Sequence, residues 1–297
     1  MRDQTPTRIA VWLLAARPKT LWASVAPVIV GTSLAWRDGL FHWPMALAAL
    51  LGAMLIQIGT NFANDLSDYE RGADSVARTG PLRVTQAGLV TPSQIRRAIV
   101  ATFALAFAVG VALVWRGGWP IVWVGIASIA AGVLYTGGPF PYGYRGFGDL
   151  FVFLFFGPVA VAGTYYVQAL RVASPVWMMG AAMGCLATAI LVVNNLRDID
   201  TDRQAGKMTL AVRLGRRGSA WEYALLLAAA FAMPVLMVLL DFGRAGVLAA
   251  GAVMLLGVPL ARTAFSSGRA TTLNLLLART ARLQALYAVA FAIGTIL

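Results

Sequence analysis

The sequence predicts an all-α, polytopic membrane protein. The chain has 297 residues, of which 59% are hydrophobic and only 12% are charged, whereas soluble domains carry about 25% charged residues. Long apolar stretches almost free of charge alternate with short polar ones, and crossing a bilayer core takes about 20 mostly apolar residues. Backbone groups in lipid must be satisfied internally, so these stretches are expected to be helices.

Nine apolar stretches meet this description, and we expect each to be one transmembrane helix. They cover residues 20–36, 44–64, 98–115, 119–136, 148–169, 175–195, 221–240, 245–261 and 280–297. The first is not expected to be a cleavable signal, because further spans follow it. No linker or low-complexity tract divides the chain, so residues 1–297 are expected to form a single membrane domain.

The net charge of +12 raises the question of a nucleic-acid partner, but the distribution of charge favours membrane orientation instead. Of the 24 Lys and Arg residues, the loops of one side hold only Arg37, Arg116, Arg171 and Arg244. The positive-inside rule therefore predicts a cytoplasmic N-terminus and a C-terminus outside, in the inner (cytoplasmic) membrane of the cell. Nine spans also require the two termini to lie on opposite sides of the membrane. No nucleic-acid partner is expected.

Most of the acidic residues lie in two clusters. The first cluster contains Asn61, Asn64, Asp65 and Asp68. Residues three or four apart are neighbours on a helix, so Asp65 and Asp68 are expected to share a face that the two asparagines extend by one turn.

The second cluster follows the sixth apolar stretch. By the same spacing, Asp198 and Asp202 are expected to share a face that Asn194 and Asn195 extend, while Asp200 points elsewhere. Both clusters belong to loops predicted on the cytoplasmic side.

Paired carboxylates at the end of an apolar helix predict a divalent cation between them. Magnesium prefers hard oxygen ligands and commonly takes one or two carboxylates plus substrate phosphate oxygens. Basic residues of the same region could bind the phosphate; they are Arg17, Lys19, Arg71, Arg78, Arg83, Arg197, Arg203, Lys207 and Arg213. Two facing carboxylate pairs thus predict a magnesium–diphosphate site.

Within a membrane, the natural diphosphate substrate has a long apolar tail. Magnesium is a Lewis acid, so an allylic C–O bond can ionise, and aromatic faces can stabilise the resulting carbocation. The candidates on this side are Tyr69, Tyr135, Tyr142 and Tyr144. The tail is expected in a groove between spans, because burying each CH₂ is worth roughly 0.8 kcal/mol.

These motifs resemble those of the UbiA-type intramembrane aromatic prenyltransferases. Asn64-Asp65-x-x-Asp68 is similar to the first half of their first motif, and Asp198-x-x-x-Asp202 is similar to the second. Gly72 stands where the general pattern has a further Asp. Asp74 is expected to substitute for it, as in one branch of the family.

That branch is the 1,4-dihydroxy-2-naphthoate polyprenyltransferases of menaquinone biosynthesis. Four runs carry the resemblance: residues 17–21, Gly80-Pro81-Leu82-Arg83-Val84-Thr85-Gln86-x-Gly88, residues 135–139, and a run that starts with Asn194-Asn195-Leu196-Arg197-Asp198 and continues through Gly206-Lys207-x-Thr209-Leu210-Ala211-Val212-Arg213-Leu214-Gly215. The resemblance implies nine transmembrane helices around a central cavity with cytoplasmic Asp-rich capping loops. It also implies Mg²⁺-dependent transfer from a polyprenyl diphosphate to 1,4-dihydroxy-2-naphthoate with decarboxylation, giving demethylmenaquinone.

The expected roles follow from these motifs. Magnesium is expected to bind Asp65, Asp68, Asp198 and Asp202, supported by Asn61, Asn64, Asp74 and Asn195. Diphosphate is expected to contact Asn64, Arg78, Arg197 and Lys207. The acceptor carboxylate is expected to contact Arg17 or Lys19, unless these two are only positive-inside anchors.

Other functions stay open at this point. A prenyltransferase of the same family could use 4-hydroxybenzoate, homogentisate, a porphyrin or a glycerol lipid as its acceptor. An ion-coupled secondary transporter would place acids near the midplane of the membrane, whereas here they cluster towards one face. A membrane phosphotransferase would need an Asp-Gly-x-x-Ala-Arg run, which this chain lacks.

Overall fold

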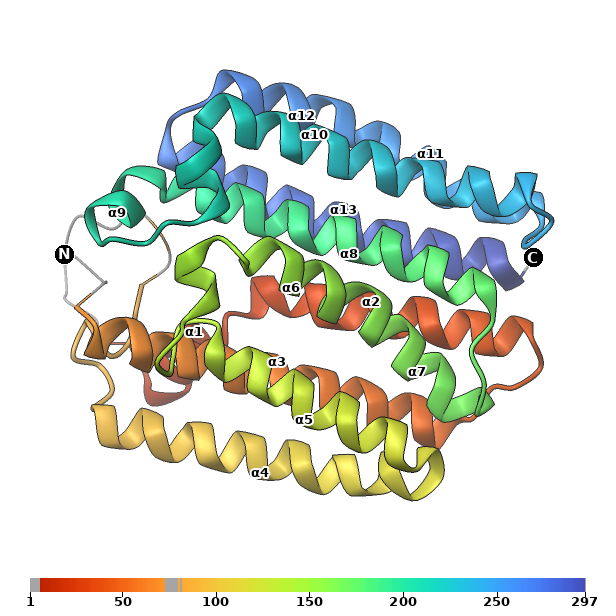
Figure 1. Cartoon of the computed structure of the whole chain (residues 1–297), viewed down its shortest axis with the longest axis horizontal. Coiled ribbons are helices and arrows are strands. Elements are labelled where there is room, and N and C mark those ends of the chain that lie inside the picture. The colour runs from red at the N-terminus through yellow and green to blue at the C-terminus, as the bar shows by residue number, and fades with distance from the viewer. Residues whose placement is uncertain (1–5, 73–79, 81, 297) are drawn as a thin grey trace.

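The computed structural model describes residues 6–72, 80 and 82–296, in which helices run roughly alongside one another (Figure 1). The α-helices are α1 (Arg8–Ala16), α2 (Pro18–Arg37), α3 (Trp43–Glu70), α4 (Pro92–Gly117), α5 (Trp119–Leu134), α6 (Gly148–Leu154), α7 (Ala160–Ala169), α8 (Ser174–Arg197), α9 (Ile199–Gln204), α10 (Leu210–Leu239), α11 (Leu248–Val253), α12 (Gly257–Ser266) and α13 (Ala270–Ile296). Short turns of other helix types are η1 (Tyr142–Arg145), η2 (Phe155–Val159), η3 (Ala245–Val247) and η4 (Met254–Leu256). The described part of the chain contains no strand, which confirms the all-α prediction.

Each of the nine predicted stretches is helical over most of its length. Among the described residues, seven helical segments are long and apolar enough to cross a membrane, and an eighth counts if α1 and α2, bent by 59°, form one span. Helix α5 has only 16 residues, about 24 Å at 1.5 Å per residue, against a bilayer core of about 30 Å. The nine-span topology therefore stays a prediction.

Local sequence explains where the helices begin and bend. Five helices carry a proline in their first turn, where a missing N–H costs nothing; they are α2, α3, α4, α5 and α8. Between α6 and α7, Pro158 lies in the π-helical turn η2, since proline cannot complete an ordinary helical hydrogen bond. Helix α10 is interrupted at Gly215, whose φ is 70°.

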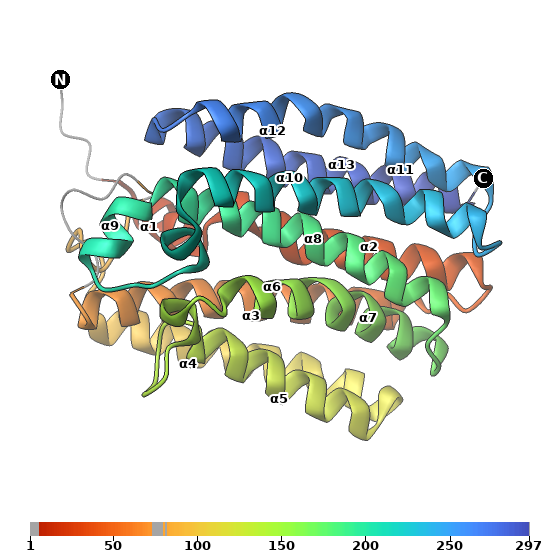
Figure 2. The same ribbon diagram turned by 45° about the horizontal axis from the view of Figure 1, so that its top comes forward.

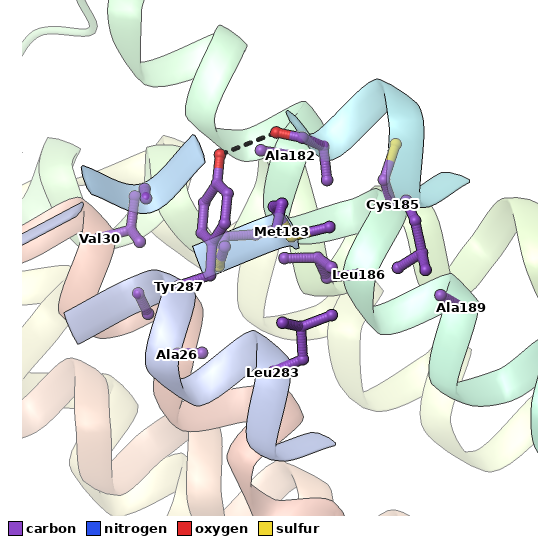
Figure 3. Packing of buried hydrophobic residues seen from close by; sticks show 14 of the residues in the cluster. Ala26, Val30, Ala182, Met183, Cys185, Leu186, Ala189, Leu283 and Tyr287 are labelled. Atoms are coloured by element: carbon purple, nitrogen blue, oxygen red, sulfur yellow. Dashed lines mark hydrogen bonds between the residues drawn. The ribbon is translucent and has the colours of Figure 1, made fainter. Parts of the chain in front are cut away.

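The main core surrounds α8, which packs against α10, α13, α6 and η2. Figure 3 shows Met183 and Leu186 of α8 meeting Ala26 of α2 and Leu283 of α13. The hydroxyl of Tyr287 donates a hydrogen bond of 3.0 Å to the carbonyl of Ala230, so this buried polar group is satisfied. The core thus fixes α2, α8, α10 and α13 relative to one another.

The two Asp-bearing motifs lie at the same end of the bundle. In Figures 1 and 2, α1, α9 and the start of α10 lie at the left end, and α13 ends at the right. Asp68, near the end of α3, contacts Lys207, which follows α9. The predicted convergence of two distant segments is therefore confirmed.

Close packing at glycines holds α8 against the α6–α7 segment. A Cβ added at Gly184 would lie 2.5 Å from the carbonyl oxygen of Phe153 and 2.8 Å from its ring. We expect Gly184→Ala to lower the free energy of unfolding by about 1–3 kcal/mol, the usual cost of overpacking. Thermal unfolding in detergent measures this. Gly251→Ala is the matched control, since its Cβ would approach Phe231 no closer than 4.0 Å, and an equal loss in both variants would contradict the expectation.

Candidate active site

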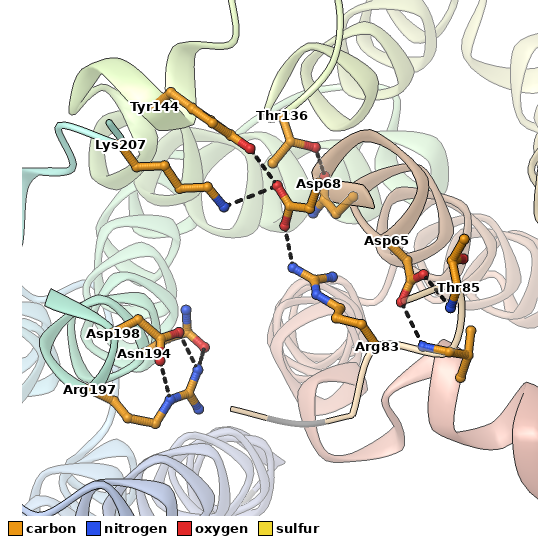
Figure 4. Close-up of polar contacts among 12 residues, drawn as sticks. Asp65, Asp68, Arg83, Thr85, Thr136, Tyr144, Asn194, Arg197, Asp198 and Lys207 are labelled. Atoms are coloured by element: carbon orange, nitrogen blue, oxygen red, sulfur yellow. Dashed lines mark hydrogen bonds and ion pairs between the residues drawn. The ribbon is translucent and has the colours of Figure 1, made fainter. Parts of the chain in front are cut away.

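A cavity of about 1,360 Å³ runs through the bundle, lined by residues of α1 to α9 and α13. One end of the cavity is polar, and both Asp-bearing motifs contribute to it (Figure 4). The rest is lined mainly by aliphatic, aromatic and glycine residues. Such a cavity suits a ligand with a charged head and an apolar tail.

Asp68 is the centre of the polar end, and its side chain is almost fully buried. One carboxylate oxygen accepts hydrogen bonds from the Tyr144 hydroxyl at 2.7 Å and the Lys207 ammonium at 3.0 Å. The other oxygen accepts from the guanidinium of Arg83. Figure 4 shows these three donors surrounding the carboxylate. Asp68 therefore connects the segments that follow α3, precede α6 and follow α9.

Asp65 has a different environment, although it lies one turn from Asp68. Its two carboxylate oxygens accept the backbone N–H groups of Val84 at 3.2 Å and Thr85 at 3.1 Å. It is not among the described residues that line the cavity. In this arrangement Asp65 anchors the segment around Arg83 to α3, and the expected shared face with Asp68 does not turn both carboxylates towards the cavity.

The asparagines of the first motif also line the cavity. The amide oxygen of Asn64 accepts a hydrogen bond of 2.8 Å from the hydroxyl of Thr136. The amide nitrogen of Asn61 donates at 2.9 Å to the carbonyl of Ala16, at the end of α1. Asn61 thus ties the turn between α1 and α2 to α3.

The second motif lies where α8 ends. Arg197 donates to both carboxylate oxygens of Asp198, at 2.8 and 2.6 Å. The same guanidinium donates to the amide oxygens of Asn194 at 2.9 Å and Asn274 of α13 at 2.8 Å. A guanidinium with several acceptors is held in one orientation, so Arg197 and Asp198 form a fixed, buried ion pair.

The remaining acids of this motif separate as the spacing predicts. Asp202 on α9 lines the cavity, as do Asp198 and Asn195. Asp200 points away from it, because its exposed carboxylate pairs with the exposed Arg216 at 2.8 Å. The prediction that Asp200 lies on another face is confirmed.

Of the four other predicted site residues, only Arg17 is fully described. Arg17, between α1 and α2, lines the cavity and has a left-handed backbone with φ of 54°. Asp74 and Arg78 lie outside the described residues, and so does the side chain of Lys19.

Of the four candidate tyrosines, Tyr135, Tyr142 and Tyr144 line the cavity. Tyr69 is 39% exposed and is not among the described lining residues. Phe151 stacks on Tyr142 with ring centroids 4.2 Å apart. Aromatic faces therefore lie close to the polar end.

The oxygen donors of the polar end fit magnesium in their chemistry. Carboxylate and amide oxygens are its usual ligands, and Asp68, Asp198, Asp202 and Asn64 present them to one cavity. Within the described residues, no group of three His, Cys, Asp or Glu side chains is placed to hold a metal ion by itself. Magnesium commonly takes one or two carboxylates together with substrate phosphate oxygens.

The sequence did not predict the side-chain contacts that organise this site. Arg83 and Tyr144 contact Asp68, and Thr136 contacts Asn64. Arg83 and Thr136 lie within runs that carry the family resemblance, so a signal existed for these two. Asn274 lies 77 positions from Arg197, and only the tertiary fold reveals their contact.

Comparison with known proteins adds to this geometry. The model of the UbiA prenyltransferase family matches residues 24–283. A 1,4-dihydroxy-2-naphthoate octaprenyltransferase of Mycobacterium tuberculosis is 46% identical over 231 residues, which cover 77% of this chain and 78% of that protein. One of Escherichia coli is 43% identical over 235 residues, covering 76% of each.

The fold has a counterpart among solved structures. The structure of a UbiA homolog from Archaeoglobus fulgidus bound to GPP and Mg²⁺ superposes with a TM-score of 0.67 at 16% identity. The match covers 97% of this chain and 100% of that one. At this identity the likeness concerns the fold alone.

Proposed function

This chain belongs to the UbiA prenyltransferase family, and we propose from this premise that it transfers a polyprenyl group from its diphosphate to 1,4-dihydroxy-2-naphthoate. Similarity to 1,4-dihydroxy-2-naphthoate octaprenyltransferases over three quarters of the chain supports the naphthoate acceptor. The observation that carries the chemistry is the gathering of Asp68, Asp198 and Lys207 at one end of an otherwise apolar cavity.

The bases of the site are paired with its acids, and a diphosphate bound in the same cavity would compete for them. Arg83 and Lys207 now neutralise Asp68, and Arg197 neutralises Asp198. A diphosphate brings more negative charge than a carboxylate and several acceptor oxygens, so these bases can turn to it. Their release leaves the carboxylates available to a divalent cation.

Magnesium, when bound, would neutralise the diphosphate and withdraw electrons from it. Asp68, Asp198 and Asp202 would hold it, with Asn61, Asn64 and Asn195 supporting. The predicted role of Asp74 stays a proposal outside the described residues. Asp65 would serve as a ligand only by releasing Val84 and Thr85, and otherwise supports the site by holding the Arg83 segment.

The transfer itself breaks the allylic C–O bond, and diphosphate leaves with the electron pair. Tyr135, Tyr142 and Tyr144 would shield the carbocation from water and offer it their π faces. The ring carbon that bears the acceptor carboxylate forms the new C–C bond, and carbon dioxide departs. No electrons are removed overall, so the product is the dihydroxy form of demethylmenaquinone.

Binding roles follow from position. We propose Arg197, Lys207, Asn64 and the undescribed Arg78 as diphosphate contacts. Arg17, at the cavity wall, would orient the acceptor carboxylate together with Lys19.

In the cell, we propose a nine-span protein of the inner (cytoplasmic) membrane with a cytoplasmic N-terminus and a C-terminus outside. The excess of Lys and Arg in the loops near α9 supports this orientation. The two Asp-bearing loops would then cap the cavity from the cytoplasm.

An acceptor screen tests the proposed function. Purified full-length protein in liposomes is given one prenyl diphosphate with magnesium and each acceptor in turn, and products are identified by mass spectrometry. We expect a prenylated naphthalenediol lacking the carboxylate. Prenylation of 4-hydroxybenzoate or homogentisate alone would overturn the acceptor. Ion-driven solute uptake without any prenyl transfer would instead favour a transporter.

A further inference from the structure

The apolar part of the cavity extends far beyond the polar end. Ala49 and Asp68 both line it, so along α3 it extends for about 28 Å at a rise of about 1.5 Å per residue. This is close to the thickness of a bilayer core, about 30 Å. The cavity therefore offers space for much more than a short allylic group.

Four glycines on four different helices line the apolar part: Gly52 of α3, Gly110 of α4, Gly125 of α5 and Gly163 of α7. Contacts show how they are grouped. Gly52 faces Val109 and Leu113, which lie on either side of Gly110 along α4, and Gly163 faces Val124, next to Gly125.

None of these glycines is required by backbone conformation or by close packing. A Cβ added at Gly110 or Gly125 would meet nothing within 4 Å, and at Gly52 and Gly163 the nearest atoms lie 3.8 and 4.0 Å away. None of the four has a positive φ. They differ from Gly184, where a Cβ would collide with Phe153.

Glycine within a helix costs stability, about 0.8–1.0 kcal/mol relative to alanine in water. A position that tolerates a side chain sterically and still carries glycine suggests that the empty space is used. Here the empty space belongs to the apolar part of the cavity. At Gly52 this part lies more than about 20 Å from Asp68 along α3.

We propose that these four glycines determine the length of prenyl tail that the enzyme accepts, by keeping the apolar part of the cavity open. The inference rests on the proposed prenyl transfer and adds a specificity determinant to it. A short tail ends before it reaches the glycines, whereas a long tail must pass between α4 and α5 beside them. Side chains added there should exclude long donors and spare short ones.

The test compares Gly125→Leu and Gly110→Leu with the unmodified full-length protein in liposomes. Each is given geranyl diphosphate or octaprenyl diphosphate at equal concentration with magnesium and the naphthoate acceptor. We expect the ratio of kcat/KM for the octaprenyl donor to that for the geranyl donor to fall at least about tenfold, since even one mismatched methylene changes kcat/KM by about 10–200-fold.

Ala127→Leu is the matched control. Ala127 lies on α5 two positions from Gly125, is exposed, and is not among the described lining residues. The leucine of this variant adds the same bulk outside the cavity and should leave the ratio of the two kcat/KM values unchanged.

Two results would overturn the inference. One is an unchanged ratio in both glycine variants, and the other is an equal loss of both donors in both variants, because a blocked far end should not affect a short tail. If the unmodified protein used neither donor, the proposed function itself would fail, and this result is distinct from the other two.

Discussion

Replacing Asp68 by alanine is expected to lower kcat/KM for prenyl transfer at least about 100-fold, the usual effect of removing one strong electrostatic group from a catalytic site. Asp68 is the carboxylate that Arg83, Tyr144 and Lys207 all contact. Its loss removes a proposed metal ligand and the carboxylate that Arg83 and Lys207 share. Initial rates with a prenyl diphosphate and the naphthoate measure the effect.

Two further variants make this result interpretable. Asp68→Asn keeps the size of the side chain while removing its charge, so it should be as inactive as the alanine variant yet elute as a folded protein in detergent. Asp200→Ala is the matched control, because Asp200 belongs to the second Asp cluster but pairs with Arg216 at the surface. Unimpaired transfer by Asp68→Asn, or a comparable loss in Asp200→Ala, would argue against the proposed site.

Removing divalent cations is expected to reduce transfer to the background rate. The proposed site brings a diphosphate close to several carboxylates, which repel it unless cations lie between them. Dialysis against excess EDTA followed by rate measurement provides the test, and magnesium added back should restore the rate. Equimolar magnesium–EDTA complex serves as the control for inhibition by the chelator itself.

Persistent activity in EDTA without added magnesium would contradict the metal site. The double variant Asp65→Ala, Asp198→Ala gives a second, independent check. It removes one acid from each motif, and full activity in that protein would exclude both as ligands.

The length and apolar composition of the stretches were sufficient to predict the long helices. Stretches such as 175–195 are long, apolar and almost uncharged, and this one became the buried helix α8. The stretch at 119–136 shows where this reasoning reaches its limit. Its composition suits a span, but the helix ends at Leu134 before a turn rich in glycine and proline.

Helical spacing predicted which part of each motif faces the cavity better than it predicted the role of each residue. It separated Asp200 from Asp198 and Asp202, because a two-residue step changes the face of a helix. It did not separate Asp65 from Asp68, since a three-residue step leaves both on one side of α3. What distinguishes them is the segment around Val84, which folds back on Asp65 from 19 positions away.

Long-range contacts lie beyond any local pattern. Lys207 reaches Asp68 across 139 positions, and Asn274 reaches Arg197 from the last helix. The charges of these motifs predicted that acids and bases would meet, but the pairing depends on how α3, α8 and α13 pack.

The shared contacts of Asp68 have a consequence for discrimination among anions. An incoming anion competes for Lys207 and Arg83 with a carboxylate that is already paired with both of them. A monoanion offers no more charge than the group it must replace, so it gains little. A diphosphate carries more charge than one carboxylate, so we expect the site to bind it in preference to simple monoanions.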